Sequence, residues 1–171
     1  MTVLIKRIFI FSLFAVLLTT LNSCGIYSFT GADTGNAETI SIDYFQNYAP
    51  LAQPTLSQNF TETLRDKFIA QTNLNLVERN ADLRITGSVT GYDTRPVAIQ
   101  GNETAALNRL TITINVTYTN TLEQEKSFEK SFSRFADFES SVSLSSVQDQ
   151  LEEEIGDQLA QDIFNESVIN W

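Results

Sequence analysis

The sequence contains no histidine, and it has one cysteine, one tryptophan and three prolines among 171 residues. The lack of histidine excludes a Ser-His-Asp triad, a histidine metal site and a histidine-based pH switch. A lone cysteine excludes an intrachain disulfide framework. Basic residues number 11 against 21 acidic ones, and the resulting formal charge of −10 disfavours binding to nucleic acid. With 42% hydrophobic and 11% aromatic residues, the chain is predicted to bury a core in a single domain.

The N-terminal residues are typical of a secretory signal. Lys6 and Arg7 precede the apolar run IFIFSLFAVLL at positions 8–18. This run is shorter than the roughly 20 residues that span a bilayer, so it fits the hydrophobic region of a signal peptide. We therefore predict a signal peptide over residues 1–23. Its removal takes away two positive charges and no acid, which changes the formal charge from −10 to −12.

The residues Leu21, Asn22, Ser23 and Cys24 resemble a bacterial lipobox. The resemblance implies cleavage before Cys24, a diacylated Cys24 thiol and an acylated new amino terminus. Three acyl chains anchor a protein firmly, since each buried methylene contributes about 0.8 kcal/mol. Gly25 occupies the position where aspartate would resemble an inner-membrane retention signal, so we expect the periplasmic side of the outer membrane. The alternatives are a plain secretory signal with an incidental cysteine and an uncleaved membrane anchor.

A tether is predicted over residues 24–37, followed by one α+β domain over residues 38–171. Strands are predicted at residues 38–45, 83–92, 107–121 and 127–138, with a loop at 93–105, and a further short strand at 74–77 is left open. Apolar helical stripes are formed by Leu56, Phe60, Leu64 and Phe68, and by Val147, Leu151, Ile155, Leu159 and Ile163. The pattern indicates a two-layer sandwich with two helices packed on one face of a four-stranded, mostly antiparallel sheet.

Several local features carry this prediction. Thr55 with Gln58 forms a capping-box pattern at the expected start of the first helix, and the second helix is expected to open at Ser145. Ile40, Ile42 and Tyr44 alternate in the first strand. Three glutamates of the second helix are expected on or beside its solvated face, namely Glu152, Glu153 and Glu154.

Residues 107–121 form the clearest strand. One face is apolar, and the other carries Thr111, Thr113, Asn115, Thr117 and Thr119. Because the two helices cover the apolar face, the hydroxyl-rich face is expected to stay open. Short uncharged groups can contact a polar wall, such as the lumen of an outer-membrane β-barrel, at little desolvation cost. We interpret Thr111, Thr113, Asn115 and Thr117 as partner-binding. The alternative is that threonines simply suit exposed strand positions.

Three stretches resemble the lipopolysaccharide-assembly lipoprotein family LptE: CGIYSFTG at positions 24–31, TISIDYF at 39–45 and PVAIQGNETAALNRL at 96–110. The resemblance implies a two-helix, four-strand sandwich without enzyme activity. It also implies that the protein plugs and helps to assemble a barrel of the LptD type, which places lipopolysaccharide in the outer leaflet.

Arg109, Lys126, Lys130 and Arg134 are the candidate lipopolysaccharide-binding residues, because phosphates favour cationic hydrogen-bond donors. The alternative is that they pair with nearby acids, namely Glu123, Glu125 and Glu129. A strand over residues 127–138 would place Lys130 and Arg134 on one face with Phe128 and Phe132. The phenylalanine spacing in this segment also fits a helix.

No motif points to a cofactor, a metal or catalysis. The acids Asp149, Glu152, Glu153, Glu154 and Asp157 lie on a predicted helix without the loop spacing of a calcium site. No nucleophile has a base at hand. The leading hypothesis is a non-enzymatic outer-membrane scaffold. The alternatives are an adaptor of another envelope machine, such as a secretin pilot or a polysaccharide exporter subunit, and a hydrolase that uses two carboxylates.

Overall fold

The structure, a computed structural model, describes residues 32–97 and 106–169. Along the chain it contains β1 (Thr39–Ile42), β2 (Gln46–Asn47), α2 (Pro54–Gln71), β3 (Asn75–Leu76), β4 (Leu83–Val97), β5 (Leu107–Asn120), the 3-10 turn η2 (Gln124–Lys126), β6 (Phe128–Glu139) and α3 (Leu144–Val168). The predicted signal peptide, Cys24 and residues 98–105 of the predicted loop lie outside the described residues.

The strands form one mixed sheet in the order β3-β1-β4-β5-β6, and β2 also pairs with β4. The long strands β4, β5 and β6 run antiparallel, while β1 and β2 run parallel to β4. The sheet therefore has six strands, two of them only two residues long, where four were predicted. Residues 127–138 form strand β6, not a helix, offset by one residue from the predicted bounds.

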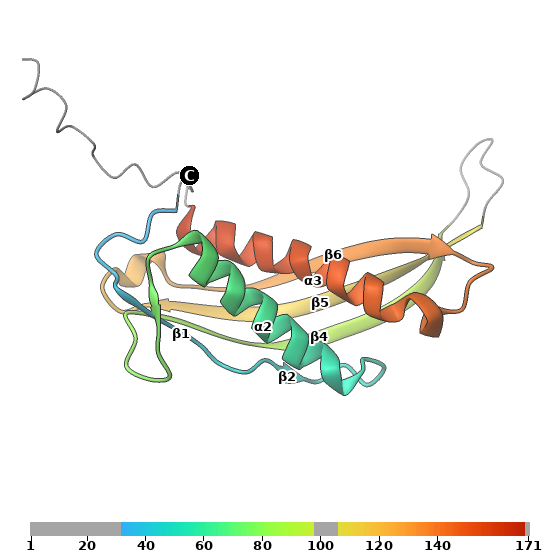
Figure 1. The fold of residues 1–171 in the computed structure, drawn as a ribbon, viewed down its shortest axis with the longest axis horizontal. Coiled ribbons are helices and arrows are strands. Elements are labelled where there is room, and N and C mark those ends of the chain that lie inside the picture. Colours follow the sequence, from blue (N-terminus) through green and yellow to red (C-terminus); the bar gives the residue numbers. More distant parts are fainter. Residues whose placement is uncertain (1–31, 98–105, 170–171) are drawn as a thin grey trace, which may run out of the picture. The chain divides into compact units, whose positions relative to one another are not determined.

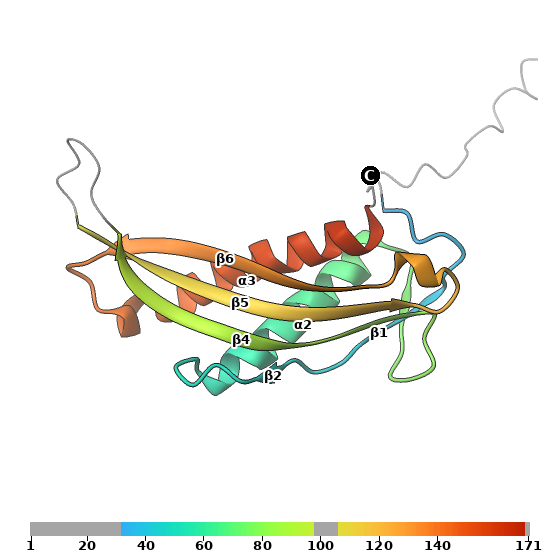
Figure 2. The ribbon, with the colours of Figure 1, turned by 180° about the vertical axis from the view of Figure 1, so that it is seen from behind.

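The predicted α+β two-layer sandwich is confirmed. Both helices lie on the same face of the sheet (Figure 1), and the view from behind shows the other face without a helix among the described residues (Figure 2). The predicted stripe of α2 is buried, and so is that of α3 except for the half-buried Val147. These side chains form a single core with the apolar face of β5, which is why the two faces of the sheet differ so strongly in chemistry.

The predicted first strand breaks after Ile42, and this break corrects one expectation. Tyr44 was expected to face the core with Ile40 and Ile42, but it is 48% exposed, and Phe45 is fully buried in its place. The Ile42 carbonyl accepts hydrogen bonds from the Arg65 guanidinium of α2, and the Phe45 amide donates to Thr61 Oγ1. Side-chain bonds from the helix thus replace the sheet pairing, and β2 resumes pairing at Gln46.

Three other boundaries differ from the predictions. Strand β4 continues to Val97, so residues 93–97 are not a loop, because they pair with the start of β5. Helix α2 begins at Pro54 with Gln53 at the N-cap position, and Thr55 does not cap it. Proline favours the first helical position, since its missing N–H would have no helical partner. The packed domain also starts before residue 38, as the Asp33 amide donates to the Val168 carbonyl at 2.6 Å.

Candidate functional site

The open face of the sheet is a continuous polar surface centred on β5. Thr111, Thr113, Asn115 and Thr117 alternate with the buried Ile112, Ile114, Val116 and Tyr118, as predicted. The residues paired with them from the two neighbouring strands are also mostly small and polar: Thr86, Ser88, Gly91 and Asp93 of β4, and Glu129, Ser131, Ser133 and Phe135 of β6. Most of this surface carries hydroxyls and amides without formal charge.

Few hydrogen bonds link the side chains of this face to one another. Thr113 Oγ1 lies 3.1 Å from Ser133 Oγ, and Thr90 Oγ1 donates to the Thr113 carbonyl at 3.4 Å. Thr111 and Thr117 have no side-chain hydrogen bond to another described residue. Hydroxyls of this kind both donate and accept, so the face can hydrogen-bond to a varied polar surface without leaving a buried charge.

Ion pairs stand at one end of the open face. Arg109 binds Asp137 of β6 through two hydrogen bonds of 2.7 and 2.8 Å, and its guanidinium lies 3.6 Å from the ring centre of Phe135. The hydrogen bond from Arg109 lowers the pKa of Asp137 and raises that of Arg109. Arg95 pairs with Asp93 at 2.5 Å on the adjacent strand.

These groups surround a shallow depression of about 390 Å³, whose lining includes Gly91, Arg95, Arg109, Thr111 and Thr113. Gly91 sits at the β-bulge between Val89 and Gly91, and a Cβ there would lie 3.0 Å from Thr113 Cβ. The missing side chain therefore opens the floor of the depression. Chemically, the depression offers two guanidinium groups at its edge and hydroxyls at its base.

The other three candidate basic residues lie elsewhere. Lys130 and Arg134 share a face of β6 with Phe128 and Phe132, as predicted for a strand. This face is the one toward the helices, and the two cations pair with Glu166 at 2.9 Å and Asp162 at 2.5 Å of α3. The hydrogen bond to Asp162 raises the pKa of Arg134. Lys126 in η2 pairs with Glu123 at 3.0 Å, as the alternative interpretation expected. The fold thus does not gather the four cations into one patch, and it satisfies each of them with a carboxylate.

A buried polar cluster joins α3 to β4, and it corrects the expectation that Glu152 lies at the solvated face. Glu152 is only 6% exposed, and its Oε1 accepts hydrogen bonds from Tyr92 Oη at 2.9 Å and Gln148 Nε2 at 2.8 Å. Burial raises the pKa of Tyr92 above its usual range, and Glu152 adds to the shift. Glu152 lies one helical turn after Gln148 and next to Leu151 of the apolar stripe. This spacing is a weak sequence signal that Glu152 is buried, and the run of three glutamates points the other way.

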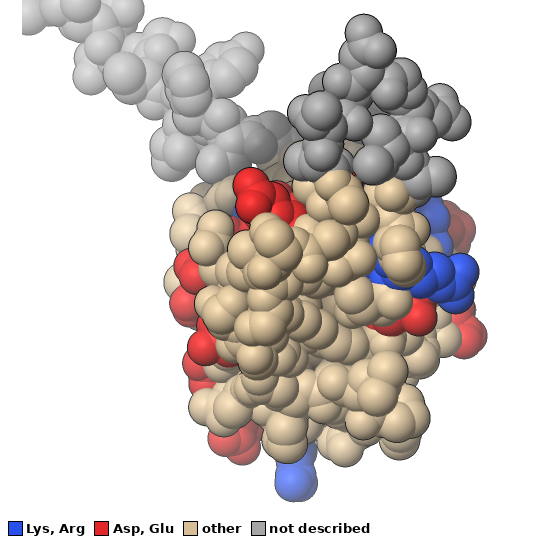
Figure 3. Space-filling model, turned by 90° about the vertical axis from the view of Figure 1, so that its right-hand side faces the viewer, with Lys and Arg blue, Asp and Glu red and all other residues tan. Residues whose placement is uncertain are grey.

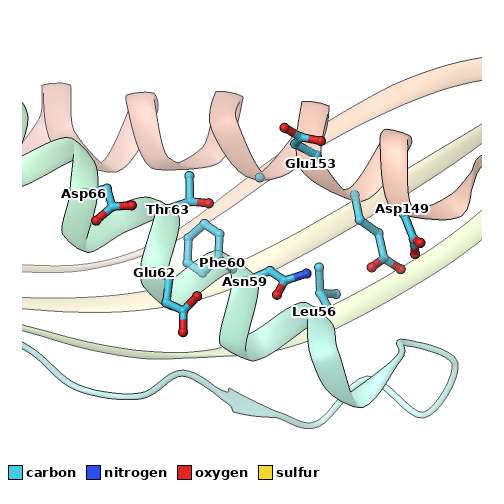
Figure 4. Close-up of a pocket in the computed structure, with 10 residues that line it drawn as sticks. Leu56, Asn59, Phe60, Glu62, Thr63, Asp66, Asp149 and Glu153 are labelled. Atoms are coloured by element: carbon cyan, nitrogen blue, oxygen red, sulfur yellow. The ribbon is translucent and has the colours of Figure 1, made fainter.

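A cleft of about 410 Å³ runs between α2 and α3 beside this cluster (Figure 4). Its carboxylates come from both helices: Glu62 and Asp66 of α2, and Asp149, Glu152 and Glu153 of α3. No lysine or arginine of the described residues lines it. Apart from Glu152 these acids are exposed to water. Within residues 32–97 and 106–169, no group of three His, Cys, Asp or Glu side chains has the arrangement that could hold a metal ion.

None of the helices in the described part of the chain is both long enough and apolar enough to cross a bilayer.

The chain is similar to several solved structures at low sequence identity. The hypothetical protein CT253 from Chlamydia trachomatis superposes with a TM-score of 0.53 at 6% identity, over 78% of this chain and 99% of that one. A minor lipoprotein from Acinetobacter baumannii gives 0.49 at 15% identity, over 75% and 91%. The rare lipoprotein B from Shewanella oneidensis gives 0.47 at 12% identity, over 73% and 91%.

No curated protein sequence matches the chain significantly. A family model does match, over residues 37–167, and its description is LptE, lipopolysaccharide-assembly. That range spans nearly all of the described domain, from two residues before β1 to one residue before the end of α3. The chain therefore belongs to the LptE lipopolysaccharide-assembly family.

Proposed function

We propose that the protein is a non-enzymatic lipoprotein of the outer membrane that scaffolds and plugs an LptD-type barrel during lipopolysaccharide assembly. Its anchor is the acylated Cys24, and its docking surface is the open face of the sheet. The observation that carries this proposal is the helix-free, largely uncharged surface around Thr111, Thr113, Asn115 and Thr117. Membership of the LptE family supports it.

The chemistry of the open face suits the lumen of a barrel. The inner wall of such a barrel is polar, and its strands present side chains that hydrogen-bond in both directions. Hydroxyl and amide groups lose little on leaving water when they find such partners, whereas unpaired charges lose several kcal/mol. A flat surface of short side chains also approaches a wall closely and loses little side-chain entropy. The ion pairs at one end, Arg109 with Asp137 and Arg95 with Asp93, are already neutralised.

The acidic cleft does not support the hydrolase alternative. Two-carboxylate catalysis needs one acid in an environment that keeps it protonated and another that stays ionised. Glu152 is the one buried carboxylate of the cleft, and two donors already bind its Oε1. Glu62, Asp66 and Asp149 are exposed on helix surfaces. We therefore assign the cluster of Glu152, Tyr92 and Gln148 to the attachment of α3 to β4.

Co-purification from detergent-solubilised outer membrane tests the docking face. Thr113→Asp with Thr117→Asp places two charges against the barrel wall, and we expect the amount of barrel recovered to fall by tenfold or more, which corresponds to about 1.4 kcal/mol or more. Thr113→Ser with Thr117→Ser retains the hydroxyls and should leave recovery unchanged.

A charge-matched control places the same two carboxylates on the helix layer, as Gln150→Asp with Asn165→Asp, both at exposed positions of α3. It should also leave recovery unchanged. Equal recovery of the barrel with all variants would show that the open face is ordinary surface and does not contact the barrel. A secretin or an exporter subunit in place of a barrel would support the adaptor alternative.

We also propose that cationic side chains of this protein contact the phosphates of lipopolysaccharide, with Arg109, Lys126, Lys130 and Arg134 as candidates. Lys130 and Arg134 stand on β6 with the aromatic rings of Phe128 and Phe132, and Lys130 Nζ lies 5.5 Å from the ring centre of Phe132. Such a surface combines charge with apolar area, which suits an amphipathic glycolipid. A phosphate would have to exchange with Glu166 and Asp162, which now bind these two cations.

A pair of double variants separates ligand binding from structure. Lys130→Ala with Arg134→Ala should reduce lipopolysaccharide binding about tenfold at low salt and less at high salt, because the lost contacts are ionic. Glu166→Gln with Asp162→Asn breaks the same ion pairs but keeps both cations, so binding should hold or rise. Binding is measured with purified lipopolysaccharide, and folding is checked by urea unfolding. Equal losses in both double variants would identify the residues as structural charges.

A further inference from the structure

One large apolar side chain interrupts the hydroxyl-rich open face of the sheet. Phe135 of β6 is 47% exposed, and among the described strands β4, β5 and β6 it is the one large apolar side chain that is exposed. Its register partner on β5 is Thr111, at the centre of the helix-free side seen in Figure 2. An aromatic ring half in water on a docking face marks a point where burial against a partner contributes strongly to binding.

Arg109 is held over the ring of Phe135 before any partner arrives. Its guanidinium carbon lies 3.6 Å from the ring centre, and its Nε and Nη2 donate to the two carboxylate oxygens of Asp137 at 2.7 and 2.8 Å. A guanidinium over a ring gains cation–π attraction and stacking. The ring and the carboxylate together fix the orientation of the guanidinium, so little side-chain entropy is lost when a partner binds it.

The depression beside Arg109 leaves the other side of its guanidinium free. Phe135 belongs to β6, whereas the residues that line the depression come from β4 and β5, so the guanidinium lies between the ring and the depression. The depression has a volume of about 390 Å³, its floor is opened by Gly91, and Thr111 and Thr113 supply hydroxyls. A planar group that enters it can stack on the guanidinium from the side opposite Phe135.

The charges around the depression balance one another, which favours a neutral occupant. Arg95 pairs with Asp93 and Arg109 pairs with Asp137, so these four residues carry no net formal charge. Figure 3 views the domain from the end at which β4 finishes and β5 begins, and the basic atoms at its right-hand margin lie beside acidic ones. An anionic occupant would have to displace one of the two aspartates, and an ammonium group would meet two guanidinium groups.

We propose that the depression takes a tyrosine side chain from the inner wall of the barrel, which stacks on Arg109 opposite Phe135 and hydrogen-bonds to Thr111 or Thr113. This inference rests on the proposed function, and it assigns Arg109 to the partner protein instead of lipopolysaccharide. Tyrosine combines a ring with a polar tip, as a polar wall and a hydroxyl-lined depression require. Arginine and aromatic side chains also dominate the binding energy of protein interfaces.

Photocrosslinking in living cells identifies the occupant of the depression. A photoreactive side chain at Thr111, which lines the depression, should trap a peptide of the barrel, and mass spectrometry gives the trapped position. We expect that peptide to carry a tyrosine next to the trapped position. Thr117 lies on the same face of β5 but outside the lining of the depression, so it serves as the reference for the docking face.

The two positions distinguish the inference from the proposed function. Barrel adducts at Thr117 would support the proposed function by themselves. If Thr111 then trapped lipopolysaccharide, a barrel peptide without a tyrosine or nothing, the inference would be overturned and the proposed function would stand. If neither position gave a barrel adduct, both would be overturned.

Substitutions that remove the planar groups give an independent readout. Arg109→Lys keeps a positive charge beside Asp137 but loses the planar guanidinium, so we expect the co-purified barrel to fall about fivefold at both low and high salt. Phe135→Leu keeps an apolar side chain but loses the ring, and it should reduce recovery by a similar factor. The double variant should lose little more than either single variant, because both changes act on the same stack.

Arg84→Lys is the matched control for Arg109→Lys. Arg84 of β4 also pairs with an aspartate, Asp43 at 2.6 Å, but neither cation–ring contact within the described residues involves it. Recovery of the barrel with this variant should change by less than about twofold. Urea unfolding confirms that each variant is folded. Wild-type recovery with folded Arg109→Lys and Phe135→Leu would contradict the proposal.

Discussion

Replacing Cys24 with serine should move nearly all of the protein from the membrane fraction to the soluble periplasmic fraction. The proposed acyl chains on Cys24 are the anchor. One acyl chain alone gives marginal binding, so the loss of all three removes membrane affinity almost completely. Fractionation after a carbonate wash measures the effect.

The test needs a defined N-terminus, because blocked processing would leave the apolar run at positions 8–18 on the protein. We therefore combine Cys24→Ser with an ordinary cleavable signal in place of residues 1–23. Gly25→Ser with Cys24 intact is the matched control and should stay in the membrane. Mass spectrometry of the mature N-terminus should find three acyl chains on the control. Membrane retention of the serine variant, with an unmodified N-terminus, would refute the anchor.

Replacing Gly87 with alanine should have the largest effect on stability. Gly87 of β4 lies beneath the ring of Phe45, and a Cβ there would come within 2.4 Å of both Phe45 Cε1 and the Asn115 carbonyl oxygen. Phe45 packs edge-on against Phe60 with ring centres 5.0 Å apart, so the ring cannot move without opening the contact between β2 and α2. We expect a loss of about 3 kcal/mol in the free energy of unfolding, as for an overpacked core.

Gly156→Ala is the matched control for this substitution. Gly156 lies within α3, and its nearest neighbour, Phe60 Cδ2, would be 4.0 Å from an added Cβ. Alanine fits there at ordinary contact distance and favours the helix, so we expect a gain of about 0.5–1 kcal/mol. Urea unfolding of both variants in the soluble Cys24→Ser background gives the two values. A Gly87→Ala variant as stable as the parent would show that Phe45 does not occupy this position in solution.

The helix stripes and the two faces of β5 were predictable because they depend on local periodicity. A residue's neighbours at i+2 in a strand, or at i+3 and i+4 in a helix, share its face whatever the rest of the chain does. The alternation from Leu110 to Tyr118 therefore identified both the core face and the candidate docking face. The same periodicity predicted that Lys130 and Arg134 would share a face with Phe132.

The partners of charged residues were not predictable in the same way. Arg134 binds Asp162, Lys130 binds Glu166, and Arg109 binds Asp137, all far along the chain. Sequence proximity favoured Glu125 and Glu129 instead, and of the nearby acids only Glu123 forms such a pair, with Lys126. Long charged side chains pair with the carboxylates that are nearest in space, and the packing of α3 on β6 determines which carboxylates those are.

The burial of Glu152 is the clearest example of a property that depends on tertiary structure. Glu152 stands in a run of three glutamates, where an exposed helix surface is the ordinary expectation. Its burial depends on Tyr92, which lies 60 residues earlier in the sequence and whose hydroxyl becomes available only when α3 packs on the sheet. The end of the first strand depends on α2 in a similar way, since Arg65 binds the Ile42 carbonyl and Thr61 accepts a hydrogen bond from the Phe45 amide.

The sequence by itself determined the layers, the apolar faces and the presence of an open hydroxyl-rich face, because these follow from the spacing of apolar residues along single elements. The tertiary structure alone decided which carboxylate neutralises each cation and which glutamate is buried. Those properties arise between elements distant in the chain, and their free energies depend on separations and burial that exist only after the helices have packed on the sheet.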